Sequence, residues 1–172
     1  RRIMFGFAQD ATARKTAERQ LSEAARAQAE HNQALAELSR SDVWREVELA
    51  QVLGAITEAG VRSLKVARVG VWLYDEARSK LTLADLFEQT TSAHLAGQEL
   101  PRLANPPYFE ALDADRALHV VDAQSDSRTC QFGPDYLIPL GITSRMDAPV
   151  RRQGKTVGIV CCEAVGAARA WT

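Results

Sequence analysis

The first third of the chain has the pattern of one long amphipathic helix. Residues 7–53 contain neither glycine nor proline, and apolar positions recur there at alternating steps of three and four residues. This spacing is the a/d repeat with which helices pair in a coiled coil. We therefore predict a helical rod that pairs in parallel with a second copy through one seam. The seam positions are Leu21, Ala24, Gln28, His31, Leu35, Leu38, Asp42, Arg45, Leu49, Val52, Ile56 and Ala59.

Polar side chains interrupt this seam in two layers, Gln28/His31 and Asp42/Arg45. A polar layer weakens a coiled coil but fixes its register. A second interpretation stays open, because few seam members before residue 43 are bulky and the many alanines have high helix propensity by themselves. On that interpretation the rod is a solvated single helix.

A second apolar row lies beside the seam from residue 43 to residue 64. Two rows predict two packing partners, one being the sheet of the helix's own domain and the other a neighbouring helix. Ser39 and Asp42 could cap a new helix. The seam keeps its phase through this point, however, which favours one continuous helix. The second row is Val43, Val47, Ala50, Gly54, Val61 and Leu64.

From residue 67 the apolar spacing changes to a period of two, which indicates strands. Two hairpins are predicted, one turning at residues 75–79 and one at Gly154-Lys155. The predicted fold class is α+β (mixed α/β), with a long N-terminal helix followed by an antiparallel sheet with helices on both faces. The predicted elements are strands 67–75, 80–88, 117–121, 144–153 and 156–163, short helices 106–112 and 134–140, and loops 89–102 and 125–131.

Composition places the chain among ordinary globular proteins. Apolar residues make up 46% and charged residues 25%, which argues against disorder. A net charge of −1 offers no basic field to attract nucleic acid or an anionic membrane, and no apolar run approaches the ~20 residues of a membrane span. We expect no nucleic-acid partner, no direct membrane contact and a cytoplasmic location. Three cysteines are too few for a disulfide framework and fit a reducing compartment.

The N-terminal residues resemble the exit of a PAS sensor domain. Residues 6–18 read GFAQDATARKTAE, which matches a last strand followed by a D-I-T-E-R-K type of junction at four of its six positions. The resemblance implies that residues 1–10 are the C-terminal strand of a PAS domain and that residues 11–42 are a helical coiled-coil linker. The chain begins at Arg1 rather than Met, and we expect it to be part of a longer protein.

Residues 43–172 are similar to a GAF domain. The similarity lies in the order of several strings, VARVGVWLYDE, YFEAL, HVVDAQSDSRT, YLIPLGITSRMDAPVRRQGKTVGIVCCE and RAWT. GAF domains are small-molecule sensing and dimerisation modules of signalling proteins. The resemblance implies a sheet with a pocket on one face and dimer helices on the other. The family usually continues into a C-terminal helix where this chain stops, at Trp171-Thr172.

The resemblance implies a sensory or regulatory module of a histidine kinase or a cyclic-dinucleotide enzyme. We expect a homodimer through the helical linker and the first GAF helix, which relays the binding of an unidentified small molecule. Two alternatives stay open. One is a structural dimerisation spacer without a ligand. The other is a thiol enzyme similar to the free-methionine sulfoxide reductases. Cys130 with Cys161 or Cys162 is the only pair of residues in the sequence that supports it.

No string in the chain assembles a recognisable catalytic or metal site. His31, His94 and His119 form no HxxxH pattern and the cysteines form no CxxC pattern. The G-x-S-x-G, P-loop and dinucleotide-binding patterns are also missing. We therefore expect no enzyme activity, no metal and no cofactor. Bilin-binding GAF domains carry a histidine near the Tyr-Leu of their YLxxxG string, whereas residues 132–135 read FGPD here, so a bilin is not expected.

The resemblance places the walls of a ligand pocket on strands and short helices. Cys161 and Cys162 are neighbours in a strand and should point to opposite faces, as buried small hydrophobes rather than redox thiols. Asp122 and Arg128 either bind polar groups of a ligand or pair with each other to fasten their loop, and we favour the pairing. The candidate pocket residues are Trp72, Tyr108, Phe109, Asp122, Arg128, Tyr136, Arg145 and Cys161.

Overall fold

The computed structural model describes residues 14–16, 18–26, 28–30, 32–33, 49–114 and 116–171. The chain divides into two compact units, Arg1–Asp42 and Val43–Thr172. The predicted PAS strand at residues 1–10 lies outside the described residues. So does the junction at residues 39–42, and the continuity of the rod with the domain stays a prediction.

In the first unit, every described residue is helical and exposed. Its surface carries three ion pairs at a spacing of four residues, Arg14–Glu18, Arg19–Glu23 and Arg26–Glu30, each at 3.0 Å. Such pairs add only a few tenths of a kcal/mol each, roughly.

Three predicted seam residues, Leu21, Ala24 and Gln28, lie in this helix, and Leu21 is 71% exposed. The seam residues His31, Leu35 and Leu38 lie outside the described residues. Self-pairing through the seam therefore stays a prediction.

The second unit is a seven-stranded sheet with strand order β3-β2-β1-β7-β6-β5, and β4 pairs with β2 beside β3. All its pairings are antiparallel. The elements are α2 (Leu49–Leu64), β1 (Arg68–Tyr74), β2 (Lys80–Glu88), β3 (Ala93–Leu95), β4 (Glu99–Pro101), η2 (Arg102–Ala104), α3 (Pro106–Ala114), β5 (Leu118–Val120), η3 (Cys130–Phe132), η4 (Gly133–Leu137), β6 (Ile142–Arg152) and β7 (Lys155–Val165).

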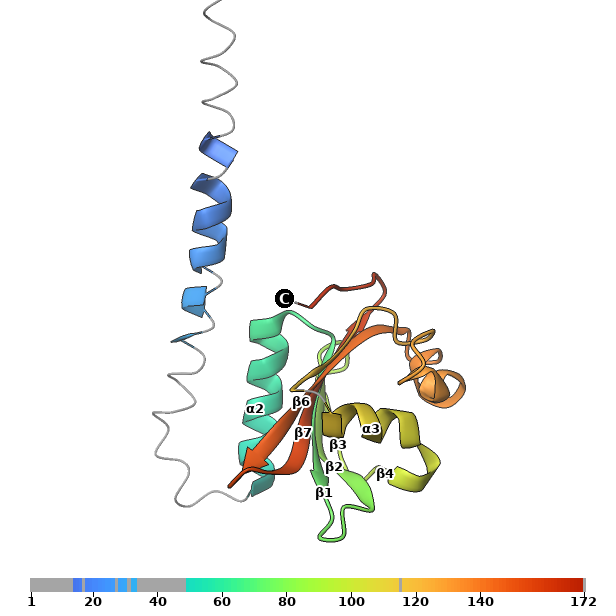
Figure 1. Ribbon diagram of the computed structural model, residues 1–172. Helices are drawn as coiled ribbons and strands as arrows, with labels where there is room; N and C mark the ends of the chain where they lie inside the picture. The colour runs from blue at the N-terminus through green and yellow to red at the C-terminus, as the bar shows by residue number, and fades with distance from the viewer. Residues whose placement is uncertain are drawn as a thin grey trace, which may run out of the picture. The chain divides into compact units, whose positions relative to one another are not determined.

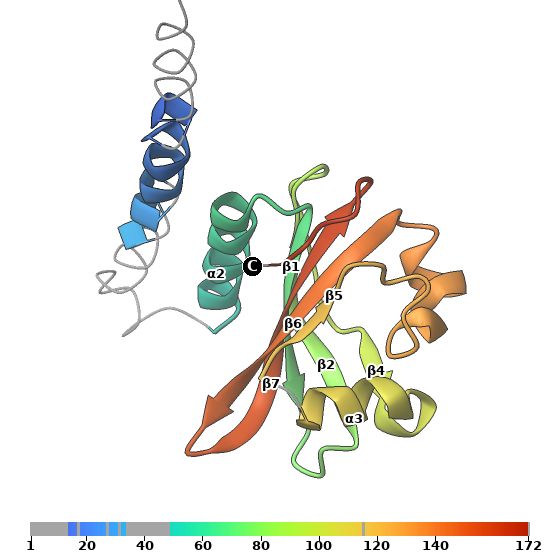
Figure 2. The same cartoon turned by 45° about the horizontal axis from the view of Figure 1, so that its top comes forward.

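Helices cover both faces of this sheet, with α2 on one side and α3 on the other (Figures 1 and 2). The predicted fold class is thus confirmed. On the α2 side, the buried cluster contains Val61, Val69 and Cys162. The helix lies close to β1 because Gly60 has no side chain, and a Cβ there would stand 3.0 Å from Val69. On the other side, a larger cluster joins the sheet to α3 and to the segment around η4.

The structure corrects several element boundaries. The predicted loop 89–102 contains β3 and β4, which both pair with the outer edge of β2. The predicted helix 134–140 is a five-residue π-helix, η4, followed by a turn. The last two strands are also shifted from their predicted bounds. β6 starts two residues earlier than predicted and ends one residue earlier, whereas β7 extends by one residue at its start and by two at its end, because the pairing runs from Ile142↔Val165 to Arg152↔Lys155.

Candidate functional site

A cavity of about 160 Å³ lies on the face of the sheet that α3 covers. Its walls come from β1, β4, β6, β7, α3 and the segment of η3 and η4, so that segments far apart in the sequence meet there. Four aromatic side chains and three charged ones reach the wall. The lining residues are Trp72, Gln98, Glu99, Leu100, Tyr108, Phe132, Tyr136, Arg145 and Glu163.

The aromatic wall is fixed by α3 and η3. Two prolines open α3 at its first positions, where a missing N–H costs nothing. Tyr108 in the first turn of α3 is fully buried. Its ring meets Phe132 edge-on, with ring centroids 5.1 Å apart and planes at 85°. This is a favourable aromatic geometry, and it orders one wall of the cavity.

Arg145 forms a buried ion pair with Asp147 on the same face of β6. Its Nε and Nη2 donate to the two oxygens of that carboxylate at 2.9 and 3.0 Å, and Nη2 also donates to the Tyr108 hydroxyl at 3.2 Å. Burial has the largest single effect and disfavours the charged guanidinium, but Asp147 together with Tyr108, Glu163 and Cys161 outweighs it, so the pKa of Arg145 lies well above its ordinary value. Arg145 is therefore a permanent cation in the cavity wall.

Glu163 on β7 is the buried anion of the cavity, with 1% of its side chain exposed. The Tyr136 hydroxyl donates to its carboxylate, 3.0 Å from each oxygen. Arg68 Nη1 stands 3.6 Å away, and the guanidinium of Arg68 lies over the Tyr136 ring at 5.3 Å. Burial raises the pKa of Glu163. The carboxyl group is thus held nearer to neutrality than a surface glutamate.

Four of the eight predicted pocket residues line this cavity, namely Trp72, Tyr108, Tyr136 and Arg145. Phe109 does not, because α3 turns it into the core against Tyr74, 6.1 Å between ring centroids. Cys161 is buried on the cavity face but does not reach the wall. Asp122 and Arg128 lie in the loop after β5, and neither lines the cavity.

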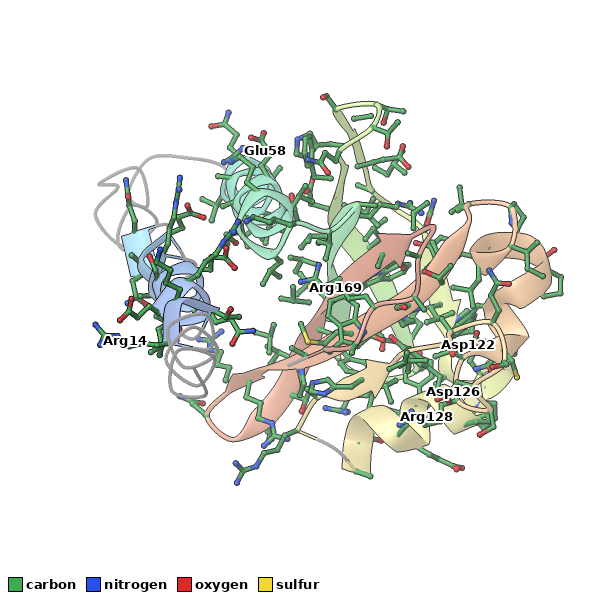
Figure 3. All side chains as sticks on the ribbon, turned by 90° about the horizontal axis from the view of Figure 1, so that it is seen from above. Arg14, Glu58, Asp122, Asp126, Arg128 and Arg169 are labelled. Atoms are coloured by element: carbon green, nitrogen blue, oxygen red, sulfur yellow. The ribbon has the colours of Figure 1, made fainter. Side chains whose placement is uncertain are left out.

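The pairing predicted for Asp122 and Arg128 is wrong. Arg128 pairs with Asp126 at 2.7 Å, while Asp122 accepts a hydrogen bond from the backbone N–H of Ser125 at 3.3 Å. Figure 3 shows Asp126 and Arg128 together in the loop that follows β5. The hydrogen bond from Arg128 lowers the pKa of Asp126. The loop is still fastened by an ion pair, but through a carboxylate two residues away rather than six.

The adjacent cysteines point to opposite faces, as predicted. Cys162 packs with Val61 and Val69 beneath α2, whereas the Cys161 sulfur lies on the other face, where a Cβ on Gly70 would stand 3.1 Å from it. Burial raises the pKa of Cys161 well above its ordinary value and that of Cys162 to about 12. Cys130 is exposed. The two buried thiols are therefore poor nucleophiles.

Glu163 is the functional candidate that the sequence analysis missed. The signal was present, because Glu163 lies two residues after Cys161 and hence on the same strand face. A charged residue at an inward position of a buried strand is uncommon unless it has a partner. Its partners, Tyr136 and Arg68, are 27 and 95 residues away in the sequence, and only the fold brings them together.

Neither a metal centre nor a membrane span is found in the part of the chain that the structure describes. There, no three His, Cys, Asp or Glu side chains gather closely enough to hold a metal ion. Within the same residues, no helix combines the length and the apolar character needed to cross a bilayer.

Comparison with known proteins relates the chain to one family. The family description "GAF domain" matches residues 48–172. No curated protein sequence matches the chain.

Solved structures with the same fold include the phycocyanobilin-bound GAF domain of a cyanobacterial phytochrome, at 17% identity, TM-score 0.66 and 82% coverage of each chain. The GAF domain of an Acinetobacter phosphoenolpyruvate-protein phosphotransferase is 14% identical, with TM-score 0.60 and coverage of 85% of this chain and 80% of that one. A Neisseria meningitidis free methionine-R-sulfoxide reductase with its substrate is 18% identical, with TM-score 0.55 and coverage of 76% and 71%.

Proposed function

This chain belongs to the GAF domain family, and we propose that it is a sensory module that binds a small molecule in the cavity beside α3. The observation that carries this proposal is the pair of buried, opposite charges, Arg145 and Glu163, in the wall of the cavity. Burying an ion costs several kcal/mol, roughly, and well-packed apolar residues often serve stability better. Buried charges at this cost fit a binding site better than a spacer that needs only stable packing.

Size limits the ligand. The cavity holds about 160 Å³, whereas drug-sized ligands occupy pockets of roughly 300–1,000 Å³. A bilin, as bound by the cyanobacterial phytochrome domain, is therefore not proposed. The ligand that fits is a compact molecule of a few heavy atoms.

We further propose that the chain forms a parallel homodimer through the helical linker and α2, as part of a histidine kinase or a cyclic-dinucleotide enzyme. Supporting observations are the exposed seam residues Leu21, at 71%, and Leu49, at 64%. On α2, Val52 and Ile56 continue the row and are only half-buried, whereas Thr57 and Val61 are buried. The ligand would act on the output by favouring one arrangement of the paired helices, which requires different affinities for the two arrangements.

Sedimentation velocity tests the dimer. The double variant Leu21→Asp, Leu49→Asp places charges in the seam without touching a buried residue. We expect the unchanged chain to sediment as a dimer at tens of micromolar (roughly the range of signalling coiled coils) and the variant as a monomer. Leu103→Asp is the matched control, because Leu103 is 94% exposed and lies outside the seam. A monomeric unchanged chain would refute the dimer.

A thermal-shift screen with metabolites tests the binding function. We expect at least one compound to raise the melting temperature of the chain, and we expect Leu100→Trp, which fills the cavity from β4, to abolish that rise. Leu103→Trp, on the exposed side of the neighbouring η2, is the matched control and should keep it. If no compound stabilises the chain more than it stabilises Leu100→Trp, the cavity is not a binding site.

We propose binding rather than thiol catalysis because of the state of the cysteines. Cys161 and Cys162 are buried with raised pKa values, and a thiol reacts through its thiolate. Treating the chain with free methionine sulfoxide and counting thiols tests this proposal. Rapid stoichiometric loss of two thiols would establish the enzymatic alternative.

A further inference from the structure

Four side chains of alternating charge form a row across four neighbouring strands. In the strand register, Arg68 on β1 is paired with Glu88 on β2 and with Glu163 on β7. Glu163 is paired in turn with Arg145 on β6. Residues paired across an antiparallel sheet point to the same face. The row therefore reads minus, plus, minus, plus along the cavity face of the sheet.

Two neighbouring members of this row, Glu163 and Arg145, have unused hydrogen-bonding capacity. Glu163 accepts a hydrogen bond only from Tyr136 among the described residues, although a carboxylate offers about four acceptor positions. Arg145 uses Nε and Nη2 for Asp147 and Tyr108, and its Nη1 makes no hydrogen bond within the described part of the chain. An acceptor and a donor thus stand on paired residues of β6 and β7, and both residues line the cavity.

The charges around the cavity already balance. Among the described Asp, Glu, Lys and Arg side chains, the four most buried are Arg68, Arg145, Asp147 and Glu163, each at most 5% exposed, and their formal charges sum to zero. The further carboxylate of the wall, Glu99, is paired with Lys80. A ligand with a net charge would leave one charge uncompensated where water is excluded, which is costly. A ligand with one positive and one negative group keeps the balance and fills both unused positions.

The aromatic part of the cavity wall determines which uncharged part of a ligand fits. Trp72, Tyr108, Phe132 and Tyr136 present aromatic surface to the cavity. Its volume of about 160 Å³ is close to that of the ~150 Å³ cavity that accepts a benzene molecule in another protein. The ligand thus has an apolar body of a few carbon atoms beside its charged groups.

We propose that the cavity binds a free α-amino acid with a small apolar side chain. Its ammonium group donates to Glu163, its carboxylate accepts from Arg145, and its side chain packs on the aromatic wall. This inference rests on the proposed function of the cavity as a ligand site, and it names the class of ligand.

Calorimetric titration of the full chain with matched ligands tests the inference without any variant. L-leucine, 3-methylbutylamine and 4-methylpentanoate share one apolar body. L-leucine carries both charged groups, 3-methylbutylamine carries only the ammonium and 4-methylpentanoate carries only the carboxylate. L-alanine, L-valine and L-methionine, each with its own amine and acid, extend the series. We expect at least one amino acid to bind at least tenfold more tightly than its amine and its acid. Equal or tighter binding of an amine or an acid, or no binding by any amino acid, overturns the inference.

The variant Glu163→Gln tests whether Glu163 is the residue that binds the ammonium group. The amide keeps the size of the side chain and an acceptor for Tyr136, but it removes the negative charge. We expect at least tenfold weaker binding of the amino acid and no weakening for the carboxylate analogue. Glu110→Gln, exposed on α3 and outside the cavity wall, is the control and should leave both affinities unchanged. An unchanged amino-acid affinity in Glu163→Gln contradicts the assignment.

The metabolite screen separates failure of this inference from failure of the proposed function. If another compound stabilises the chain, Leu100→Trp abolishes that effect and no amino acid binds, the ligand class is wrong and the sensory function stands. If nothing binds in the cavity, both fail.

Discussion

The two faces of the sheet are built from alternate residues of the same strands, yet they bury different chemistry. On the α2 face, Val61, Val69 and Cys162 form a dry apolar cluster. On the cavity face, one residue further along β7, Glu163 is buried beside aromatic rings and Arg145. One strand thus supplies both a packing surface and a polar cavity wall, because neighbouring side chains point in opposite directions.

The α2 face also buries polar groups, but it satisfies them. The Thr57 hydroxyl donates to Asp85, and His94 Nδ1 lies 3.0 Å from the same carboxylate. These contacts fasten α2 to the sheet edge formed by β2 and β3. On the cavity face, in contrast, Arg68 is buried with its Nε and Nη1 lacking hydrogen bonds. The α2 face thus satisfies the polar groups that it buries, whereas the cavity face holds a buried guanidinium that contacts Glu88 and Glu163 only at ion-pair distances of 3.7 and 3.6 Å.

The largest effect is expected from removing a charge on the cavity face. Asp147→Ala leaves Arg145 buried without its carboxylate, so we expect a loss of about 3–5 kcal/mol in the free energy of unfolding, measured by urea denaturation. Asp135→Ala removes an exposed carboxylate of η4 and should cost less than about 0.5 kcal/mol. A small effect of Asp147→Ala would show that the buried charges are not in place.

A smaller loss is expected on the α2 face. Val61→Ala removes two buried methyl groups at 1% exposure, and we expect a loss of about 2 kcal/mol. Val121→Ala, at 51% exposure, is the matched control and should be nearly neutral. The same urea series checks both. If Val61→Ala cost more than Asp147→Ala, the contrast between the two faces would be wrong.

Stability should also depend on pH through Glu163. Because burial raises its folded pKa above the ordinary 4.5, the folded chain keeps a proton that the unfolded chain releases. The contribution of Glu163 is therefore fully present below 4.5 and is lost as the pH rises through the folded pKa. Between pH 4.5 and the folded pKa, the contribution of Glu163 to the free energy of unfolding falls by at most about 1.4 kcal/mol per pH unit.

Glu163→Gln cannot ionise, so the stability of the unchanged chain relative to this variant should fall as the pH rises from 4.5. Urea denaturation at several pH values measures the difference, and Glu110→Gln should retain the pH dependence of the unchanged chain. A difference that stays constant with pH would mean that Glu163 is not buried as described.

The smallest effect concerns the cysteines. A thiol reagent at pH 8 should modify the exposed Cys130 rapidly and the buried pair at least tenfold more slowly, because both burial and the raised pKa values suppress their thiolates. Absorbance of the released reagent group measures the rate, and urea should expose all three. If Cys161 but not Cys162 reacted quickly, the cavity face would be the more open of the two.

Much of the fold could be predicted from local pattern. The alternation of Trp72 and Tyr74 with their neighbours set the faces of β1, and Gly154 marked the last hairpin. β3 and β4 were missed because they are three-residue strands with too few positions to show alternation. Their pairing depends on β2, which provides an edge that no local string reveals.

The candidate site was only half predictable. Trp72, Tyr108, Tyr136 and Arg145 were predicted from the family resemblance and line the cavity. Asp122 and Arg128 came from the same resemblance, and we favoured a pairing between them, but the turn after β5 presents Asp126 to Arg128 instead. Proximity in sequence does not determine which carboxylate a loop directs at an arginine.

The sequence by itself determined the periodicities, and with them the helix in the described residues of the first unit, the longer strands and the opposite orientation of Cys161 and Cys162. These properties follow from the geometry of a single helix or strand. The tertiary structure alone decided that Arg68, Glu163 and Arg145 stand in one row, since strand register joins residues from opposite ends of the domain. Their balance of charge, and therefore the kind of ligand that we propose, exists only once β1, β7 and β6 lie side by side.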